Sequence, residues 1–133
     1  MKVLLDTHAW IWAEEGDASL GARTRKQLLR ADTELFVSAI STLEIAQLAF
    51  RGRIALRCSV TQWVQLSLEN LQAESVELSH EIAASAFALP GDLHGDPADR
   101  ILIATARVMK LTLVTADIRI LGYPNVTTLD ARR

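Results

Sequence analysis

The sequence predicts an α/β fold in which helices cover both faces of a largely parallel sheet. Short apolar segments typical of strands alternate with longer segments typical of helices along the 133 residues. The strand segments are continuous apolar runs, as expected for strands buried on both faces. Half of the residues are hydrophobic and 23% are charged, which is typical of globular proteins. We therefore expect residues 1–133 to form a single domain.

The first half of the chain is expected to hold two strands and four helices. The apolar run Lys2–Leu5 stops at Asp6, and either Asp6 or Thr7 can cap the helix that follows. Gly52 marks the end of a later helix, because glycine readily leaves the helical conformation. In chain order we expect a strand at 2–5, helices at 8–15 and 22–31, a strand at 35–38, and helices at 41–51 and 60–71.

The second half of the chain contains the helix with the clearest start signal. Asp96 is a capping residue, Pro97 suits the first helical position, and an apolar stripe follows up to Lys110. The remaining expected elements are a short strand at 75–78, a helix at 79–89, a strand at 113–115 and an edge strand at 126–129.

Two carboxylates follow predicted strands directly. Asp6 closes the first strand, and Asp117 lies two residues beyond Thr115. In parallel sheets, ligands bind beyond the carboxyl ends of the strands. Each of these acids alone is also an ordinary helix cap, so their shared position is the informative observation. The hydroxyls of Thr7, Ser38 and Thr115 are candidates for orienting such acids.

Two further acids complete the candidate set. Asp99 lies in the first turn of the helix that Asp96 caps, where a carboxylate also favours the helix dipole. Glu44 lies within a helix, on an apolar stripe, where capping does not explain it. A carboxylate in such surroundings is costly unless it is paired or bound to a metal. The helix alone leaves two explanations open: a partner such as Arg51 or Arg53, or a charged pocket.

Several carboxylates that converge at one sheet edge repel one another, and a divalent cation removes that conflict. Ligands that are all oxygens select hard ions such as Mg²⁺ or Mn²⁺ over Zn²⁺. His8 and His94 lie near two of the acids in sequence, but no His-x-x-x-His or Cys-x-x-Cys spacing supports a histidine or thiolate site.

The overall charge limits the functional alternatives. The net charge is −2 and the pI is about 5.9, so no broad basic surface for a phosphate backbone is expected. The only cysteine is Cys58, which rules out an internal disulfide and fits a reducing cytoplasm. No apolar run approaches the length of a membrane span. Any role with nucleic acid must therefore depend on a local site.

The chain resembles the PIN-domain family, and within it the VapC toxins of toxin–antitoxin pairs. Four ordered blocks carry the resemblance: residues 4–9, 37–46, 94–106 and 113–120. The resemblance implies a three-layer α/β/α sandwich with a mostly parallel sheet. It also implies a Mg²⁺-dependent endoribonuclease, with Mn²⁺ as an alternative ion, whose acidic residues are Asp6, Glu44, Asp99 and Asp117. Asp6, Asp99 and Asp117 would hold the metal. The implied partners are an RNA substrate, a cognate VapB-like antitoxin and a second copy of the chain.

The residues argue against two other functions and leave a third open. A haloacid-dehalogenase-like phosphatase needs a second aspartate two positions after Asp6, where His8 stands. A phospho-receiver module needs paired acids after the first strand and a lysine near the last, and neither is present. A non-catalytic binding domain, whose acids only cap helices, remains open at this point.

Overall fold

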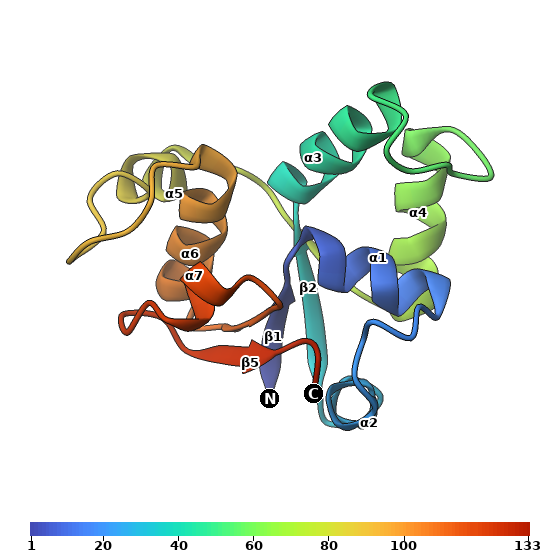
Figure 1. Ribbon diagram of the computed structural model, residues 1–133, viewed down its shortest axis with the longest axis horizontal. Helices are drawn as coiled ribbons and strands as arrows, with labels where there is room; N and C mark the ends of the chain where they lie inside the picture. The colour runs from blue at the N-terminus through green and yellow to red at the C-terminus, as the bar shows by residue number, and fades with distance from the viewer.

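The computed structural model describes residues 1–133 and contains five parallel strands with helices on both faces of the sheet (Figure 1). The strands are β1 (Lys2–Leu5), β2 (Glu34–Ser38), β3 (Glu74–Val76), β4 (Thr112–Thr115) and β5 (Thr128–Asp130). The helices are α1 (Thr7–Glu15), α2 (Ala22–Leu28), α3 (Ala39–Phe50), α4 (Val60–Leu71), α5 (His80–Ser85), α6 (Pro97–Met109) and α7 (Ile118–Leu121). The predicted three-layer α/β/α class is confirmed, and every strand pairing is parallel.

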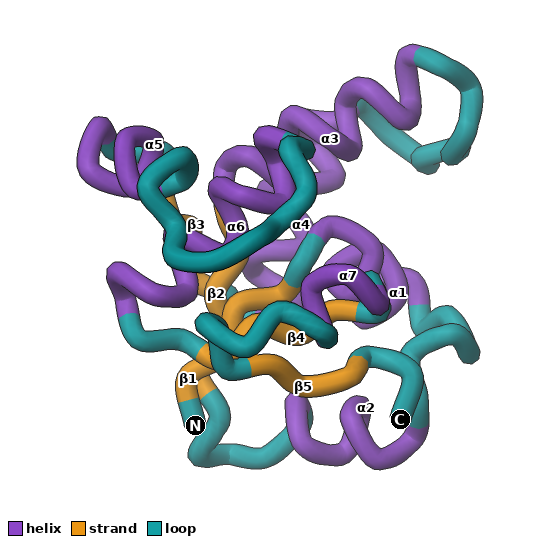
Figure 2. Tube along the Cα trace, turned by 60° about the vertical axis from the view of Figure 1, so that its left-hand side comes forward, coloured by secondary structure: helices purple, strands orange, loops and turns teal.

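The central strand β1 separates two hydrophobic cores because its side chains alternate between the faces of the sheet. Leu4 belongs to the core beneath α5, α6 and α7, together with Leu102 and Ile103. Val3 and Leu5 belong to the opposite core, which contains Trp10 and Trp63 of α1 and α4. All three β1 side chains are fully buried. Figure 1 shows β1 and β2 between α5, α6 and α7 on the left and α1 and α4 on the right, and Figure 2 shows the strands with α3 above them and α2 below.

The strand order β3-β2-β1-β4-β5 decides which carboxyl ends are neighbours. β4 lies directly beside β1, so Asp6 and Asp117 leave the sheet next to each other. The backbone N–H of Asp6 donates to the Val114 carbonyl at 3.0 Å, which extends this pairing to the end of β1. β2 flanks β1 on the other side and runs directly into α3, which carries Glu44.

Several element boundaries differ from the predictions. Near the ends of two helices, a side chain from a later segment donates to a backbone carbonyl. The helix expected over 79–89 ends at Ser85, and the Arg100 guanidinium donates to the Ala86 carbonyl at 3.0 Å. The helix expected over 22–31 ends at Leu28, where the Thr33 hydroxyl donates to the Gln27 carbonyl. The last strand covers 128–130 rather than 126–129. No helix has both the length and the apolar character that crossing a membrane requires.

The C-terminal segment is fixed against the start of α2. The N–H of Gly21 donates to the Ala131 carbonyl at 2.9 Å, and the Thr24 hydroxyl donates to the Asp130 carbonyl at 2.7 Å. A Cβ at position 21 would lie 2.1 Å from the backbone of Arg133, so only glycine permits this approach. The contact brings Arg132 to the rim of the sheet edge where the acids gather.

Candidate metal centre

All four acids selected from the sequence line one pocket beyond the carboxyl ends of β1 and β4. The pocket measures about 370 Å³ and opens to solvent. Five carboxylates border it, from residues far apart in the chain: Asp6, Glu44, Asp96, Asp99 and Asp117. Two arginines, Arg119 and Arg132, also reach it. The structure thus gathers the predicted residues in one place: three lie at or just before the start of a helix, and Glu44 lies in the second turn of α3.

Asp6 is the most deeply buried of the acids, with 9% of its surface exposed. Its Oδ1 caps α1 by accepting the N–H of Ala9 at 2.8 Å. Burial raises the pKa of Asp6, and its hydrogen bonds to Thr115 and Ala9 only partly offset that effect. The charge of Asp99 raises the pKa further. Asp6 therefore caps α1 and also carries a carboxylate whose ionisation is disfavoured by burial. A capping role and a place in the charged site are compatible.

Glu44 points into the pocket from the second turn of α3. The hydroxyl of Thr7 donates to its Oε1 at 2.5 Å, and the Ser41 hydroxyl lies 3.0 Å from that of Thr7. Glu44 forms no ion pair with Arg51 or Arg53, so of the two explanations for this residue the charged pocket is the one observed. Partial burial raises the pKa of Glu44, and the neighbouring aspartates add to the rise.

Asp99 and Asp96 divide the roles expected at the start of α6. Asp96 caps the helix by accepting the N–H of Asp99 at 2.9 Å, as predicted. This leaves the Asp99 side chain to face the pocket, where Nε2 of His94 lies 2.7 Å from its Oδ2. Burial raises the pKa of Asp99, the hydrogen bond from His94 lowers it, and the nearby carboxylates raise it, with a net rise.

Asp117 follows β4 and caps the short helix α7 by accepting the N–H of Arg119 at 2.8 Å. The Arg119 side chain also pairs with it, with Nη2 3.0 Å from Oδ2. Partial burial alone would raise the pKa of Asp117, but the hydrogen bonds and charge of Arg119 outweigh it and hold the pKa below its usual value. Asp117 thus ionises more readily than Asp6, Glu44 or Asp99, whose pKa values are raised.

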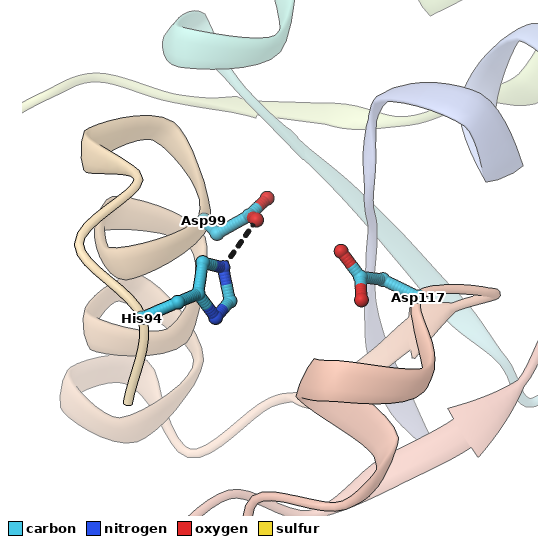
Figure 3. Close-up of side chains that lie close together, drawn as sticks. All are labelled: His94, Asp99 and Asp117. Carbon is cyan, nitrogen blue, oxygen red and sulfur yellow. Dashed lines mark hydrogen bonds and ion pairs between the residues drawn. The ribbon is translucent and has the colours of Figure 1, made fainter. Parts of the chain in front are cut away.

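Three side chains at this edge of the sheet could share one metal ion. His94, Asp99 and Asp117 each offer one ligand atom, and these atoms lie within 4.8 Å of one another. Figure 3 shows His94 turned toward Asp99, with Asp117 facing them from the start of α7. Asp6 and Glu44 line the pocket together with Asp99 and Asp117 but lie outside this group of three. The sequence showed no spacing that supports a histidine ligand, whereas the structure places His94 in this group.

The donor set fits a hard divalent cation. Burial and neighbouring acids raise the pKa values of Asp6, Glu44 and Asp99. The negative charge of the pocket is therefore only partly neutralised by the residues around it. Carboxylate oxygens dominate the lining, as Mg²⁺ and Mn²⁺ prefer. A nitrogen from His94 beside them is compatible with Mn²⁺ as well as with a role that only orients Asp99.

Sequence reasoning missed two arginines that organise this site. Arg119 bridges two of the acids, with Nη2 3.5 Å from Asp99 Oδ2 in addition to its contact with Asp117. Arg100 donates to the backbone carbonyls of Ala86, Leu93 and His94, at 3.0, 3.1 and 3.1 Å. It thereby fixes the loop that delivers His94. The position of Arg119, two residues after a strand-end aspartate, was a usable signal; the contacts of Arg100 with a distant loop were not.

Of the three hydroxyls expected to orient the acids, two do so. Thr7 binds Glu44, and Thr115 binds Asp6 and also accepts the N–H of Asp117 at 3.1 Å. Ser38 does not: its hydroxyl caps α3 by accepting the N–H of Ile40 at 3.1 Å. For Ser38 the prediction is wrong, because the abrupt transition from β2 to α3 leaves a helix N-terminus that needs a cap.

Comparisons with known proteins identify the family of this chain. The chain is 40% identical to Ribonuclease VapC22 of Mycobacterium tuberculosis over 121 residues, which is 91% of each protein. Two solved structures share the fold over 97% of the chain. One is a toxin–antitoxin complex from Klebsiella pneumoniae (TM-score 0.66, 24% identity, 97% of that chain). The other is VapBC2 from Rickettsia felis bound to a promoter DNA fragment (TM-score 0.65, 19% identity, 98% of that chain). The PIN domain model matches residues 3–125, and the chain therefore belongs to the PIN domain family.

Proposed function

We propose that this chain is a metal-dependent endoribonuclease and the toxin of a toxin–antitoxin pair, with residues 1–133 acting as one PIN domain. The observation that carries the proposal is the convergence of Asp6, Glu44, Asp99 and Asp117 on one pocket, although they are far apart in sequence. The 40% identity to a protein named as a ribonuclease supports the same activity.

In this proposal Asp6, Asp99 and Asp117 hold Mg²⁺ or Mn²⁺, and Glu44 orients the attacking water. The cation supplies Lewis acidity and neutralises the charge that develops on the scissile phosphate. The fixed Thr7 hydroxyl keeps Glu44 directed at the pocket. Attack of water on phosphorus breaks the bond to the 3′ oxygen, leaving a 3′-hydroxyl and a 5′-phosphate. The pocket is open, so a single-stranded or looped RNA segment has access to it.

The partners follow from the same proposal. Two structural relatives are described as toxin–antitoxin or VapBC assemblies, and we infer a cognate VapB-like antitoxin for this chain. A homodimer is part of the same inference. A cytoplasmic location follows from the proposed RNA substrate and suits the single free thiol, Cys58.

The test is cleavage of RNA by the purified chain with Mg²⁺ or Mn²⁺. Asp99→Asn should reduce cleavage by about a thousandfold or more while the circular dichroism spectrum stays unchanged. Asp92→Asn, in the preceding loop outside the pocket, is the matched control and should cleave as the wild type does. Full activity of Asp99→Asn would contradict the assignment.

The competing function is a non-catalytic binding domain whose acids only cap helices. The observed caps at Asp6, Asp96 and Asp117 are consistent with it. A thermal-shift titration with Mn²⁺ separates the two. A metalloenzyme gains stability as the ion binds, whereas a domain with caps alone gains none. The raised pKa values of Asp6, Glu44 and Asp99 favour the metal site, since a capping carboxylate has no need of acidic neighbours.

A further inference from the structure

Arg119 spans the two acids that lie on either side of the pocket. Its Nη2 is 3.0 Å from Asp117 Oδ2 and 3.5 Å from Asp99 Oδ2. Its Nε also donates to Asp117 Oδ1, at 3.3 Å. One guanidinium therefore contacts both carboxylates, using the planar donor geometry that suits arginine to this role.

The guanidinium competes for the same oxygens as a divalent cation. Asp99 and Asp117 are two of the three residues whose ligand atoms lie within 4.8 Å of one another. A cation bound to these carboxylates would lie close to the guanidinium, and the two positive charges would repel each other. Metal binding therefore favours a conformation in which Arg119 has moved away from at least one of the acids.

The Arg119 side chain is exposed enough to move away from the acids. It is 57% exposed, and it extends from the first turn of α7, whose start is anchored by the Asp117 cap. Its backbone therefore stays at the rim of the pocket, while its long side chain can change conformation. The phosphate cleaved in the proposed reaction must reach the same pocket, and a guanidinium offers it two parallel donors.

We propose that Arg119 is an internal counter-ion: it neutralises Asp99 and Asp117 in the metal-free protein and turns to a phosphate oxygen of the RNA once a divalent cation binds. This inference rests on the proposed nuclease function. It gives one residue two successive partners, carboxylates first and phosphate second. It also explains why an acidic pocket carries an arginine directly on its candidate ligands. Such an arginine weakens metal binding, but here it also serves to bind the phosphate.

Arg132 provides a matched control inside the same pocket. It carries the same charge and lines the same cavity, but it forms no ion pair with Asp99 or Asp117. Replacing it removes one positive charge near the metal without removing the competition for ligand oxygens. The difference between Arg119→Gln and Arg132→Gln therefore isolates the counter-ion role from general electrostatics.

The experiment measures Mn²⁺ affinity by isothermal titration calorimetry and RNA cleavage at saturating Mn²⁺, for the whole chain. We expect Arg119→Gln to lower the Mn²⁺ dissociation constant by about fivefold, and Arg132→Gln to lower it by less than about twofold. At saturating Mn²⁺, kcat of Arg119→Gln should fall about tenfold or more, because the phosphate loses a charged donor. Arg119→Lys retains the charge but not the fork, and should recover part of kcat.

Each outcome bears on a different statement. Equal Mn²⁺ affinities for Arg119→Gln and Arg132→Gln would overturn the counter-ion role. An unchanged kcat for Arg119→Gln would overturn the transfer to phosphate. A wild-type chain that neither binds Mn²⁺ nor cleaves RNA would instead contradict the proposed function, so the two failures are distinguishable. Arg119 is a surface side chain, and circular dichroism of the variant verifies that the fold is intact.

Discussion

Nε2 of His94 lies 2.7 Å from Oδ2 of Asp99, and this contact joins the loop before α6 to the first turn of that helix. Both side chains are largely buried, with 18% and 17% of their surfaces exposed. The loop is held in turn by Arg100, which donates to the carbonyls of His94 and Leu93. The Asp99 carboxylate therefore has a fixed orientation that its own helix does not provide.

Removal of this contact should weaken metal binding. In His94→Phe, Asp99 loses its hydrogen-bond donor, and we expect the Mn²⁺ dissociation constant to rise about tenfold, as is usual when a residue that orients a metal ligand is lost. His94→Gln can still donate from its amide nitrogen and should restore most of the affinity. Calorimetric titration of both variants measures the effect. Unchanged affinity in His94→Phe would show that Asp99 needs no such support.

Thr7 should control the orientation of Glu44. Its hydroxyl is the side-chain donor to Glu44, at 2.5 Å, and it is buried between α1 and α3. Thr7→Val keeps the shape but removes the donor, so we expect about 1 kcal/mol less stability in urea denaturation and at least a tenfold lower kcat. Thr7→Ser, which retains the hydroxyl, is the control. Equal kcat values in the two variants would argue against the orienting role.

Asp6→Asn should stabilise the metal-free protein. Asparagine can accept the Ala9 N–H as aspartate does, so the α1 cap is retained. The substitution also removes a buried carboxylate whose pKa is raised by burial and by Asp99. We expect the Tm in the presence of a chelator to rise by about 4 °C, and the gain in Tm on adding Mn²⁺ to disappear.

The matched control for this experiment is Asp96→Asn. Asp96 also caps a helix, but its side chain is exposed, so exchanging its carboxylate for an amide relieves no burial. Its metal-free Tm should therefore change little. A metal-free Tm of Asp6→Asn below that of the wild type would show that the Asp6 carboxylate stabilises the fold rather than straining it.

Metal affinity should fall as the pH is lowered. A cation must displace the protons of Asp6, Glu44 and Asp99, whose pKa values are raised first by burial and then by neighbouring acids. The loss of affinity should therefore begin at a higher pH than for exposed carboxylates. Mn²⁺ titrations at a series of pH values measure it. Constant affinity down to the usual carboxylate range would contradict the raised pKa values.

The stability of the metal-free fold should show the opposite trend with pH. An acid with a raised pKa holds its proton more tightly in the folded state, so its contribution is present at low pH and is lost as the pH rises through the folded pKa. Asp117, whose pKa is lowered, opposes this trend: its contribution is present at higher pH and is lost as the pH falls through its folded pKa. Urea denaturation with a chelator should therefore give a free energy of unfolding that decreases as the pH rises past the raised values.

Much of the site was predictable because its parts have local signatures. Asp6 ends an apolar strand, and Asp96 with Pro97 starts a helix, so short-range patterns locate both. Glu44 interrupts an apolar helix face, which marks it as a residue that needs a partner. These signals depend only on backbone periodicity and capping, which neighbouring residues determine.

The α/β class, the helix caps and the acids that need a partner could be predicted from the chain, because they follow from local hydrophobic periodicity and hydrogen-bond requirements. Tertiary packing sets the strand order that places Asp117 beside Asp6, and the contacts of Thr7 with Glu44 and of Arg119 with Asp99. Such contacts depend on how distant segments pack, within tenths of an ångström, and no pattern along the chain encodes that distance. The acids could be named from the sequence, but the contact of Arg119 with Asp99 could not.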